Sequence, residues 1–157
     1  MQTGAVTVLP DRQWREDAPS PYGWLGGLAW KGDASQLAFD VAFDGHPRRL
    51  LVADFDGTAH TATAPVPLPS PYTLTGDTAW WDGDLCFTVS DRARLRLVCR
   101  DGRDRLSVIT DQDDAVVWDW KPAGSGVVAL MAPSDALPEL VALRGRRITP
   151  LLSLIHI

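Results

Sequence analysis

The sequence has few of the features that mark membrane or nucleic-acid-binding proteins. No stretch approaches the roughly 18–20 consecutive apolar residues of a membrane-spanning helix, and Met1 to Gly4 show no basic or apolar region of a signal peptide. The chain has fewer cationic than anionic residues, with fifteen Lys and Arg against twenty Asp and Glu, so its formal net charge is −5. Nucleic-acid binding needs clustered cations, whereas these alternate with Asp or apolar residues. We therefore expect neither nucleic acid nor membrane as a partner.

Cysteine and histidine are also scarce. The three histidines, His46, His60 and His156, are isolated, so no metal-ligand spacing is present and we predict no cofactor. The two cysteines, Cys86 and Cys99, lie in apolar, strand-like runs without a secretion signal or a multi-cysteine framework. We therefore predict that both are buried, reduced thiols, even if a hairpin brings them close together, and that the protein is cytoplasmic.

A repeated tetrapeptide indicates the organisation of the chain. Pro19-Ser20-Pro21-Tyr22 returns as Pro69-Ser70-Pro71-Tyr72, and each copy leads after the same interval into a tryptophan, Trp30 or Trp80. A period near 50 residues is typical of a repeated supersecondary unit. The short strands and turn residues between the copies favour blades of a β-propeller.

Three rows of similar content follow an N-terminal segment of residues 1–20, in which only Ala5 to Leu9 suggests a short strand. The rows span residues 21–67, 68–110 and 111–152. Each has a Trp-led strand, a turn, an apolar strand, a third strand, a second turn and a weaker fourth strand. Gly and Asp in turns such as Asp82-Gly83 and Asp101-Gly102 suit tight hairpins. We predict an all-β fold, a partial β-propeller of about three four-stranded antiparallel blades.

Tryptophan is the one abundant aromatic residue, and it gathers where the rows begin. Such a cluster is open to two interpretations: a stacking surface for peptide or sugar, or rings that fill the wedge between twisted blades. We favour the second for the six residues concerned, Trp24, Trp30, Trp80, Trp81, Trp118 and Trp120.

Two segments carry a more specific pattern. Trp80 to Arg92 resembles a middle blade of an acylaminoacyl-peptidase-type propeller, from the serine peptidases of the prolyl oligopeptidase family. Trp118-Asp119-Trp120 and Pro133 to Leu143 are similar to the family's blade in which a Ser-containing turn precedes Pro-Glu-Leu and an apolar strand. The resemblance covers about residues 24–149. Periplasmic propellers of the Tol-Pal system share only the generic part, without both Ser90-Asp91-Arg92 and Pro138-Glu139-Leu140.

The resemblance implies a function for the parent protein. In this family the propeller precedes an α/β-hydrolase domain that carries Ser, Asp and His, and it limits access to short peptides. The chain is then expected to be a non-catalytic segment of a serine peptidase (a hydrolase). Its partners would be its own C-terminal α/β-hydrolase domain and short or N-acylated peptides. Arg92 or Arg94 would line the channel, although a solvated hairpin position is favoured for both.

No catalytic residue is predicted within the chain. The nucleophile elbow Gly-x-Ser-x-Gly needs a strand-to-helix turn, and the near match Gly124-Ser125-Gly126 lacks the spacing and falls in a predicted hairpin. Leu152 to Ile157 breaks off where a further blade should begin and resembles translated adapter sequence at the end of a metagenomic reading frame. We therefore expect a truncated piece of a longer protein, with residues 153–157 not native.

Two other functions are weighed against the peptidase segment. The main alternative is a fragment of a non-enzymatic propeller that acts as a protein-interaction scaffold. A glycosidase-type propeller would need paired carboxylates, and the only acidic cluster, Asp111, Asp113 and Asp114, is better interpreted as a turn between blades. A few blades without neighbours on both sides would expose apolar surface, so we also expect marginal stability and self-association.

Overall fold

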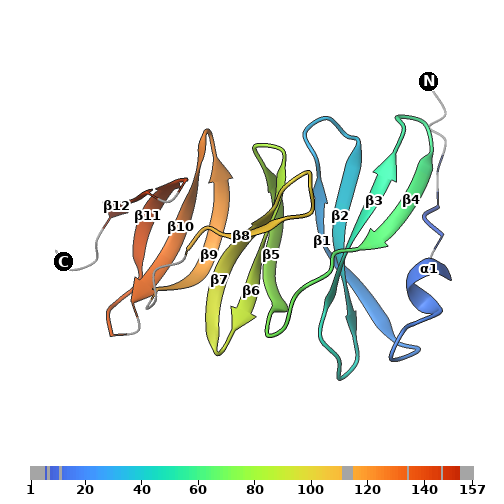
Figure 1. Cartoon of the computed structure of the whole chain (residues 1–157), viewed down its shortest axis with the longest axis horizontal. Helices are drawn as coiled ribbons and strands as arrows, with labels where there is room; N and C mark the ends of the chain where they lie inside the picture. Colours follow the sequence, from blue (N-terminus) through green and yellow to red (C-terminus); the bar gives the residue numbers. More distant parts are fainter. Residues whose placement is uncertain are drawn as a thin grey trace. The chain divides into compact units, whose positions relative to one another are not determined.

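The computed structural model describes residues 6, 8–10, 12–110, 115–133, 135–145 and 147–152, without the side chain of Gln13. Within these ranges the chain forms three four-stranded antiparallel sheets and one short helix, α1 (Arg12–Arg15) (Figure 1). The strands of each sheet are neighbours in the same order as in the sequence. The predicted all-β fold is confirmed, whereas α1 was not predicted. No described helix has the length and apolar character needed to cross a bilayer.

Each sheet is built from four consecutive strands. Sheet 1 contains β1 (Gly23–Trp30), β2 (Gln36–Phe43), β3 (Arg49–Phe55) and β4 (His60–Pro65). Sheet 2 contains β5 (Thr73–Trp81), β6 (Asp84–Asp91), β7 (Arg94–Arg100) and β8 (Leu106–Val108). Sheet 3 contains β9 (Ala115–Ala123), β10 (Gly126–Pro133), β11 (Glu139–Arg144) and β12 (Arg147–Leu152).

The chain divides into two compact units, with the boundary along the sequence between Val66 and Pro67. The first unit holds sheet 1 and the segment before it, and the second holds sheets 2 and 3.

Tight hairpins set the register of sheet 2. Asp82 and Gly83 both have positive φ, 52° and 84°, between β5 and β6, which is the geometry of a two-residue hairpin turn whose twist matches that of the strands. The next turn uses Arg92 and Ala93, with φ of 49° and 66°. These residues have no glycine-like freedom, so the pairing of β6 with β7 holds them in this conformation.

Sheets 2 and 3 share one hydrophobic core. Cys86, Leu97 and Cys99 of sheet 2 pack with apolar residues of sheet 3, among them Val117, Trp120, Val127, Ala129, Met131, Val141 and Leu143. The first strand of sheet 3, β9, contacts both β5 and β7 (Figure 1). The two sheets therefore stand against each other through alternate residues of their strands, as stacked sheets do.

The N-terminal segment covers a hydrophobic cluster on one face of sheet 1. Trp14 of α1 is buried and meets Phe39 edge-on, with 5.6 Å between ring centroids. Leu9 and Ala18 pack against the same cluster, which contains Leu37, Phe39, Val41, Phe43, Leu51 and Ala53. The predicted strand at Ala5 to Leu9 does not form in its described residues.

The tryptophan interpretation is correct for one residue and wrong for three. Trp120 is buried between sheets 2 and 3, as a wedge-filling ring should be. Trp24, Trp30 and Trp118 are more than half exposed. Trp80 and Trp81 are half-buried.

Candidate functional site

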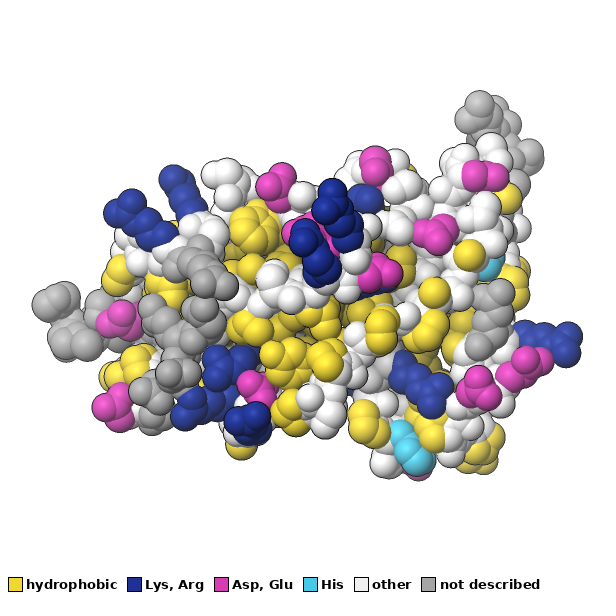
Figure 2. Space-filling view, viewed as in Figure 1, with side chains coloured by type: hydrophobic (Ala, Val, Ile, Leu, Met, Phe, Trp, Pro, Cys, Tyr) yellow, Lys and Arg dark blue, Asp and Glu magenta, His cyan; other side chains and the backbone are white. Residues whose placement is uncertain are grey.

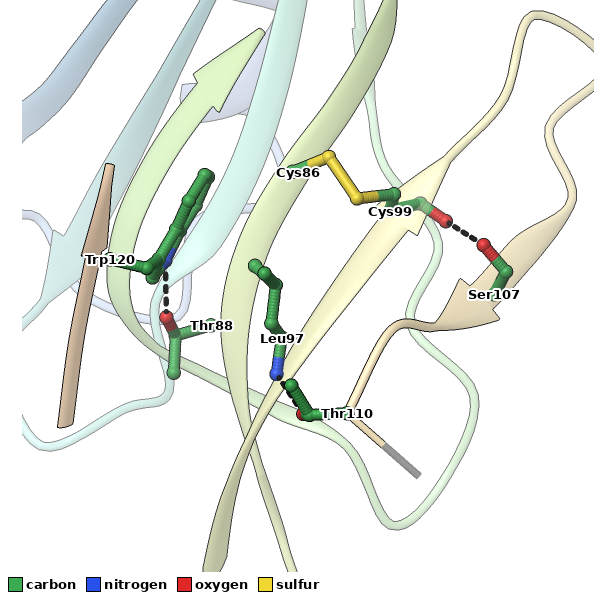
Figure 3. The surroundings of a disulfide bond; sticks show 7 residues. All are labelled: Cys86, Thr88, Leu97, Cys99, Ser107, Thr110 and Trp120. Atoms are coloured by element: carbon green, nitrogen blue, oxygen red, sulfur yellow. Dashed lines mark hydrogen bonds between the residues drawn. A yellow bond between two sulfur atoms is a disulfide. The ribbon is translucent and has the colours of Figure 1, made fainter. Parts of the chain in front are cut away.

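The interface between sheets 2 and 3 contains a disulfide, Cys86–Cys99, which corrects our prediction of reduced thiols (Figure 3). The two residues are directly opposite each other in the β6–β7 register, and both are almost fully buried. Antiparallel partners on one face have Cβ atoms about 4.5–5.5 Å apart, within reach of bridging once the strands are drawn slightly together. The prediction failed because it treated the cysteines as neighbours without a fixed register.

Polar groups around the disulfide tie the two sheets together (Figure 3). The Trp120 indole Nε1 of β9 donates a hydrogen bond to Thr88 Oγ1 of β6, at 2.9 Å. Leu97 N of β7 donates to the buried Oγ1 of Thr110, which follows β8 in the sequence, at 3.1 Å. Because buried hydroxyls cost free energy unless they are hydrogen-bonded, these bonds favour one arrangement of the interface.

A small open cavity of about 350 Å³ lies beside this interface. Its lining comes from β5, β6, β7 and β9: Thr75, Gly76, Asp77, Thr88, Leu95, Trp118, Asp119 and Trp120. The register of β5 shifts between Leu74 and Thr78, and that of β9 shifts opposite Leu130 and Met131. Bulges of this kind redirect side chains, so the exposed ring of Trp118 reaches the cavity while Trp120 enters the core.

The charges at this cavity pair with one another. Lys121 Nζ forms a short ion pair with Asp77 across the two sheets and lies 3.8 Å from an Asp119 oxygen. The hydrogen bond to Asp77 raises the pKa of Lys121, against a smaller opposing effect of burial. All three side chains are more than half exposed, so these pairs contribute little to stability. Among its described residues, the site offers no nucleophile paired with a base.

The second hollow is an apolar groove of about 990 Å³ in the first unit. It lies between the N-terminal segment and sheet 1, and its lining includes Trp14, Trp24, Leu28, Phe39 and Phe43. The segment therefore covers this face of sheet 1 only partly.

Sheet 1 also carries a buried carboxylate, Asp40 of β2, which is 3% exposed. Its desolvation raises the pKa of Asp40, and Arg48, 3.6 Å away, opposes this in part. The β1 bulge makes room for this side chain. Gly27 has φ of +58°, and a Cβ there would lie 2.3 Å from Asp40 Oδ2, so glycine is required at this position.

The raised pKa predicts how stability changes with pH. Between the ordinary value of 3.8 and the raised value, the folded state binds more protons than the unfolded state. The free energy of unfolding should therefore fall as pH rises through this window. Asp40→Asn keeps the shape and cannot ionise, so it should remove this slope and be more stable than wild type at neutral pH. Urea unfolding between about pH 4 and pH 7 measures both effects.

Asp33→Asn is the matched control for this prediction. Hydrogen bonds from Ser35 lower the pKa of the exposed Asp33, so its contribution has the opposite sign and is lost as pH falls. An Asp40→Asn variant with the wild-type pH slope would show that Asp40 is not the group responsible.

No catalytic constellation appears among the described residues. Ser125 is exposed in the β9–β10 hairpin, where a nucleophile elbow would need a following helix. His60 Nε2 is 2.6 Å from Thr63 Oγ1, a contact within its own strand. The described part of the chain also brings together no group of three or more His, Cys, Asp or Glu that would hold a metal ion.

The two arginines that the resemblance places at a channel lie at the β6–β7 hairpin. Arg92 is at the β6–β7 hairpin tip with its side chain 85% exposed, and Arg94 begins β7. Asp111, Asp113, Asp114 and His156 lie outside the described residues. On the face seen in Figure 2, Lys and Arg side chains lie beside Asp and Glu. The expected absence of a nucleic-acid partner stays a prediction.

Comparison with known proteins identifies the fold. No family model matches the sequence, and no curated protein matches it. Among solved structures, the crystal structure of TolB from Acinetobacter baumannii is similar, with a TM-score of 0.59 and 13% identity over 83% of this chain. This chain has the fold of a partial β-propeller. It covers 33% of the TolB chain, and at this identity the likeness concerns the fold alone.

Proposed function

We propose that the chain is a non-catalytic propeller segment of a serine peptidase of the prolyl oligopeptidase type. In this role it limits access of short or N-acylated peptides to a separate α/β-hydrolase domain. The observation that carries the non-catalytic part is the position of Ser125, the one near match to a nucleophile motif, in an exposed turn between two strands.

Support for the peptidase part comes from the two segments of sequence resemblance. Trp80 to Arg92 spans the β5–β6 hairpin and the start of the next turn, and Pro133 to Leu143 joins β10 to β11. Both are therefore parts of hairpins in consecutive sheets, which agrees with the blade positions that the resemblance implies.

Peptide hydrolysis tests the non-catalytic part. The purified chain, given a chromogenic N-acetylated dipeptide, should show no turnover, because no nucleophile, base and oxyanion site converge among the described residues. Ser125→Ala should behave like wild type. Turnover that a serine-directed inhibitor blocks, or that Ser125→Ala abolishes, would overturn the proposal.

The second candidate is a non-enzymatic interaction scaffold, favoured by the exposed apolar residues of both units, such as Trp24, Leu28 and Leu130. The flanking coding sequence separates the two candidates. A Gly-x-Ser-x-Gly motif within a few hundred codons downstream selects the peptidase, and a continuous propeller without that motif selects the scaffold.

The cytoplasmic location is retained as part of the proposal, but the disulfide weakens one of its arguments. Disulfides persist mainly in oxidising compartments, so the location no longer follows from the cysteines. A count of free thiols in protein taken directly from cells under acid quench separates a reducing compartment from an oxidising one.

A further inference from the structure

The interface between sheets 2 and 3 defines which side of each sheet faces its neighbour. The strands β2, β6 and β10 each have eight residues and each follow the first strand of their sheet. Sheet 2 presents the third and fifth residues of β6, Cys86 and Thr88, to sheet 3. Sheet 3 presents the second and fourth residues of β10, Val127 and Ala129, to sheet 2. We call the side of a sheet that corresponds to Cys86 and Thr88 in sheet 2 its forward face. The side that corresponds to Val127 and Ala129 in sheet 3 is its backward face.

Register extends this assignment to sheet 3. Cys86 pairs with Cys99 and Thr88 with Leu97 on the forward face of sheet 2. The equivalent pairs in sheet 3 are Val128 with Ala142 and Leu130 with Leu140. These four apolar residues form the forward face of sheet 3. Leu130 and Leu140 are 36% and 38% exposed, although the corresponding residues of sheet 2 are almost fully buried.

Register also identifies the backward face of sheet 1. Leu37 and Phe39, the second and fourth residues of β2, pair with Ala53 and Leu51 of β3. In sheet 3 the equivalent residues pack against a whole sheet. In sheet 1 they are covered by the N-terminal cap, which we define as Leu9, Trp14 and Ala18. This cap leaves the groove of about 990 Å³ between itself and the sheet.

One chain thus carries both halves of the contact that joins sheet 2 to sheet 3. We propose that the forward face of sheet 3 in one copy docks on the backward face of sheet 1 in a second copy, displacing the N-terminal cap. The proposal concerns this chain by itself and does not rest on the proposed peptidase role. The contact continues an interface already present within the chain, between apolar faces of the same register.

The cap is built to be displaceable. Its helix α1 has four residues, and among the described residues it adds no strand to sheet 1. Trp14 packs edge-on against Phe39, and Leu9 and Ala18 pack against the same cluster of sheet 1. Because a copy can accept a partner only when its cap is open, the apparent affinity is reduced by the fraction of open chains.

Docking of this kind joins two different surfaces. Such heterologous contacts close into rings or extend into larger assemblies, so the association should depend on concentration and need not stop at two copies. A sheet-on-sheet contact of apolar side chains is also intolerant of a buried, unpaired charge.

Sedimentation equilibrium over a range of concentrations tests the proposal. Wild type should associate reversibly. Leu130→Asp/Leu140→Asp should weaken the association constant by at least about tenfold, or about 1.4 kcal/mol, because it places two carboxylates on the forward face. Leu137→Asp is the matched control: Leu137 is exposed between β10 and β11, outside the sheet, so it should associate like wild type. Trp14→Ala should loosen the cap and strengthen association.

Mixing distinguishes this geometry from docking of two identical faces. A labelled Leu130→Asp/Leu140→Asp copy keeps its backward face, so it should still bind wild type and end the assembly. If it binds neither itself nor wild type, the contact joins forward face to forward face and the proposal is wrong. A wild type that remains monomeric at all concentrations also overturns it, and favours an additional sheet as the occupant. If Trp14→Ala fails to fold, the two leucine variants still decide.

Discussion

Trp120→Ala should be among the most destabilising single substitutions in this chain. Trp120 is 2% exposed and lies in the core between sheets 2 and 3. Removing a buried Trp costs about 3–5 kcal/mol, through lost burial and the cavity that remains. It also leaves the Oγ1 of Thr88, a residue that is only 5% exposed, without its hydrogen bond from the indole N–H. Thermal unfolding should shift downward by roughly 6–20 °C in a chain of this size.

Trp118→Ala is the control for this variant. Trp118 is two residues away on the same strand but 60% exposed at the cavity beside the interface, so its removal should cost less than about 1 kcal/mol. If the two variants lower the free energy of unfolding by similar amounts, or if Trp118→Ala lowers it more, then Trp120 is not the ring that packs β9 against sheet 2.

Trp120→Phe separates the hydrogen bond from the ring. It keeps a buried aromatic ring but loses the N–H donor and part of the apolar area of the indole, so the expected cost is about 1–3 kcal/mol. Thr88→Val should then add little in the Trp120→Phe background, because the two groups form a single bond and their effects are not additive. Equal effects of Thr88→Val in both backgrounds would show that the bond does not contribute.

The difference between Trp118 and Trp120 shows what the sequence leaves open. On a regular strand, residues two apart share a face, so both rings are expected together. In β9 the register shifts: Leu130 pairs with Asp119 and Met131 with Val117. Trp118 is the extra residue, and Val117 and Trp120 share the buried side. Bulges have no reliable sequence signature, so the rows of strands were predictable and the direction of each ring was not.

The disulfide was missed for a related reason. Cys86 and Cys99 are equally distant from the Arg92-Ala93 turn, and a two-residue turn there places them opposite each other. Two-residue hairpin turns favour Asn-Gly or Asp-Gly, and Arg-Ala resembles neither. The helix α1 escaped prediction because four residues are too few for a helical hydrophobic period. The cavity beside Trp118 was also missed, since its lining includes bulged strands of two different sheets, β5 and β9.

Replacing both cysteines should be the second large effect. The disulfide closes a loop with a sequence separation of 13 residues, and in the chain-entropy description such a loop stabilises the folded state by about 3 kcal/mol. Cys86→Ala/Cys99→Ala should lower the free energy of unfolding by about this amount, measured by urea denaturation without reductant. Wild type in the presence of a strong reductant should approach the stability of the double variant.

Two readouts separate the crosslink from ordinary packing. Under denaturing conditions without reductant, wild type should show no free thiol by alkylation and mass spectrometry, and two after reduction. Since both side chains are almost fully buried, a reductant should reach them slowly in the folded protein, at a rate that rises as denaturant opens the interface. If wild type shows two free thiols before reduction, and the double variant is as stable as wild type, then β6 and β7 are held by strand pairing alone.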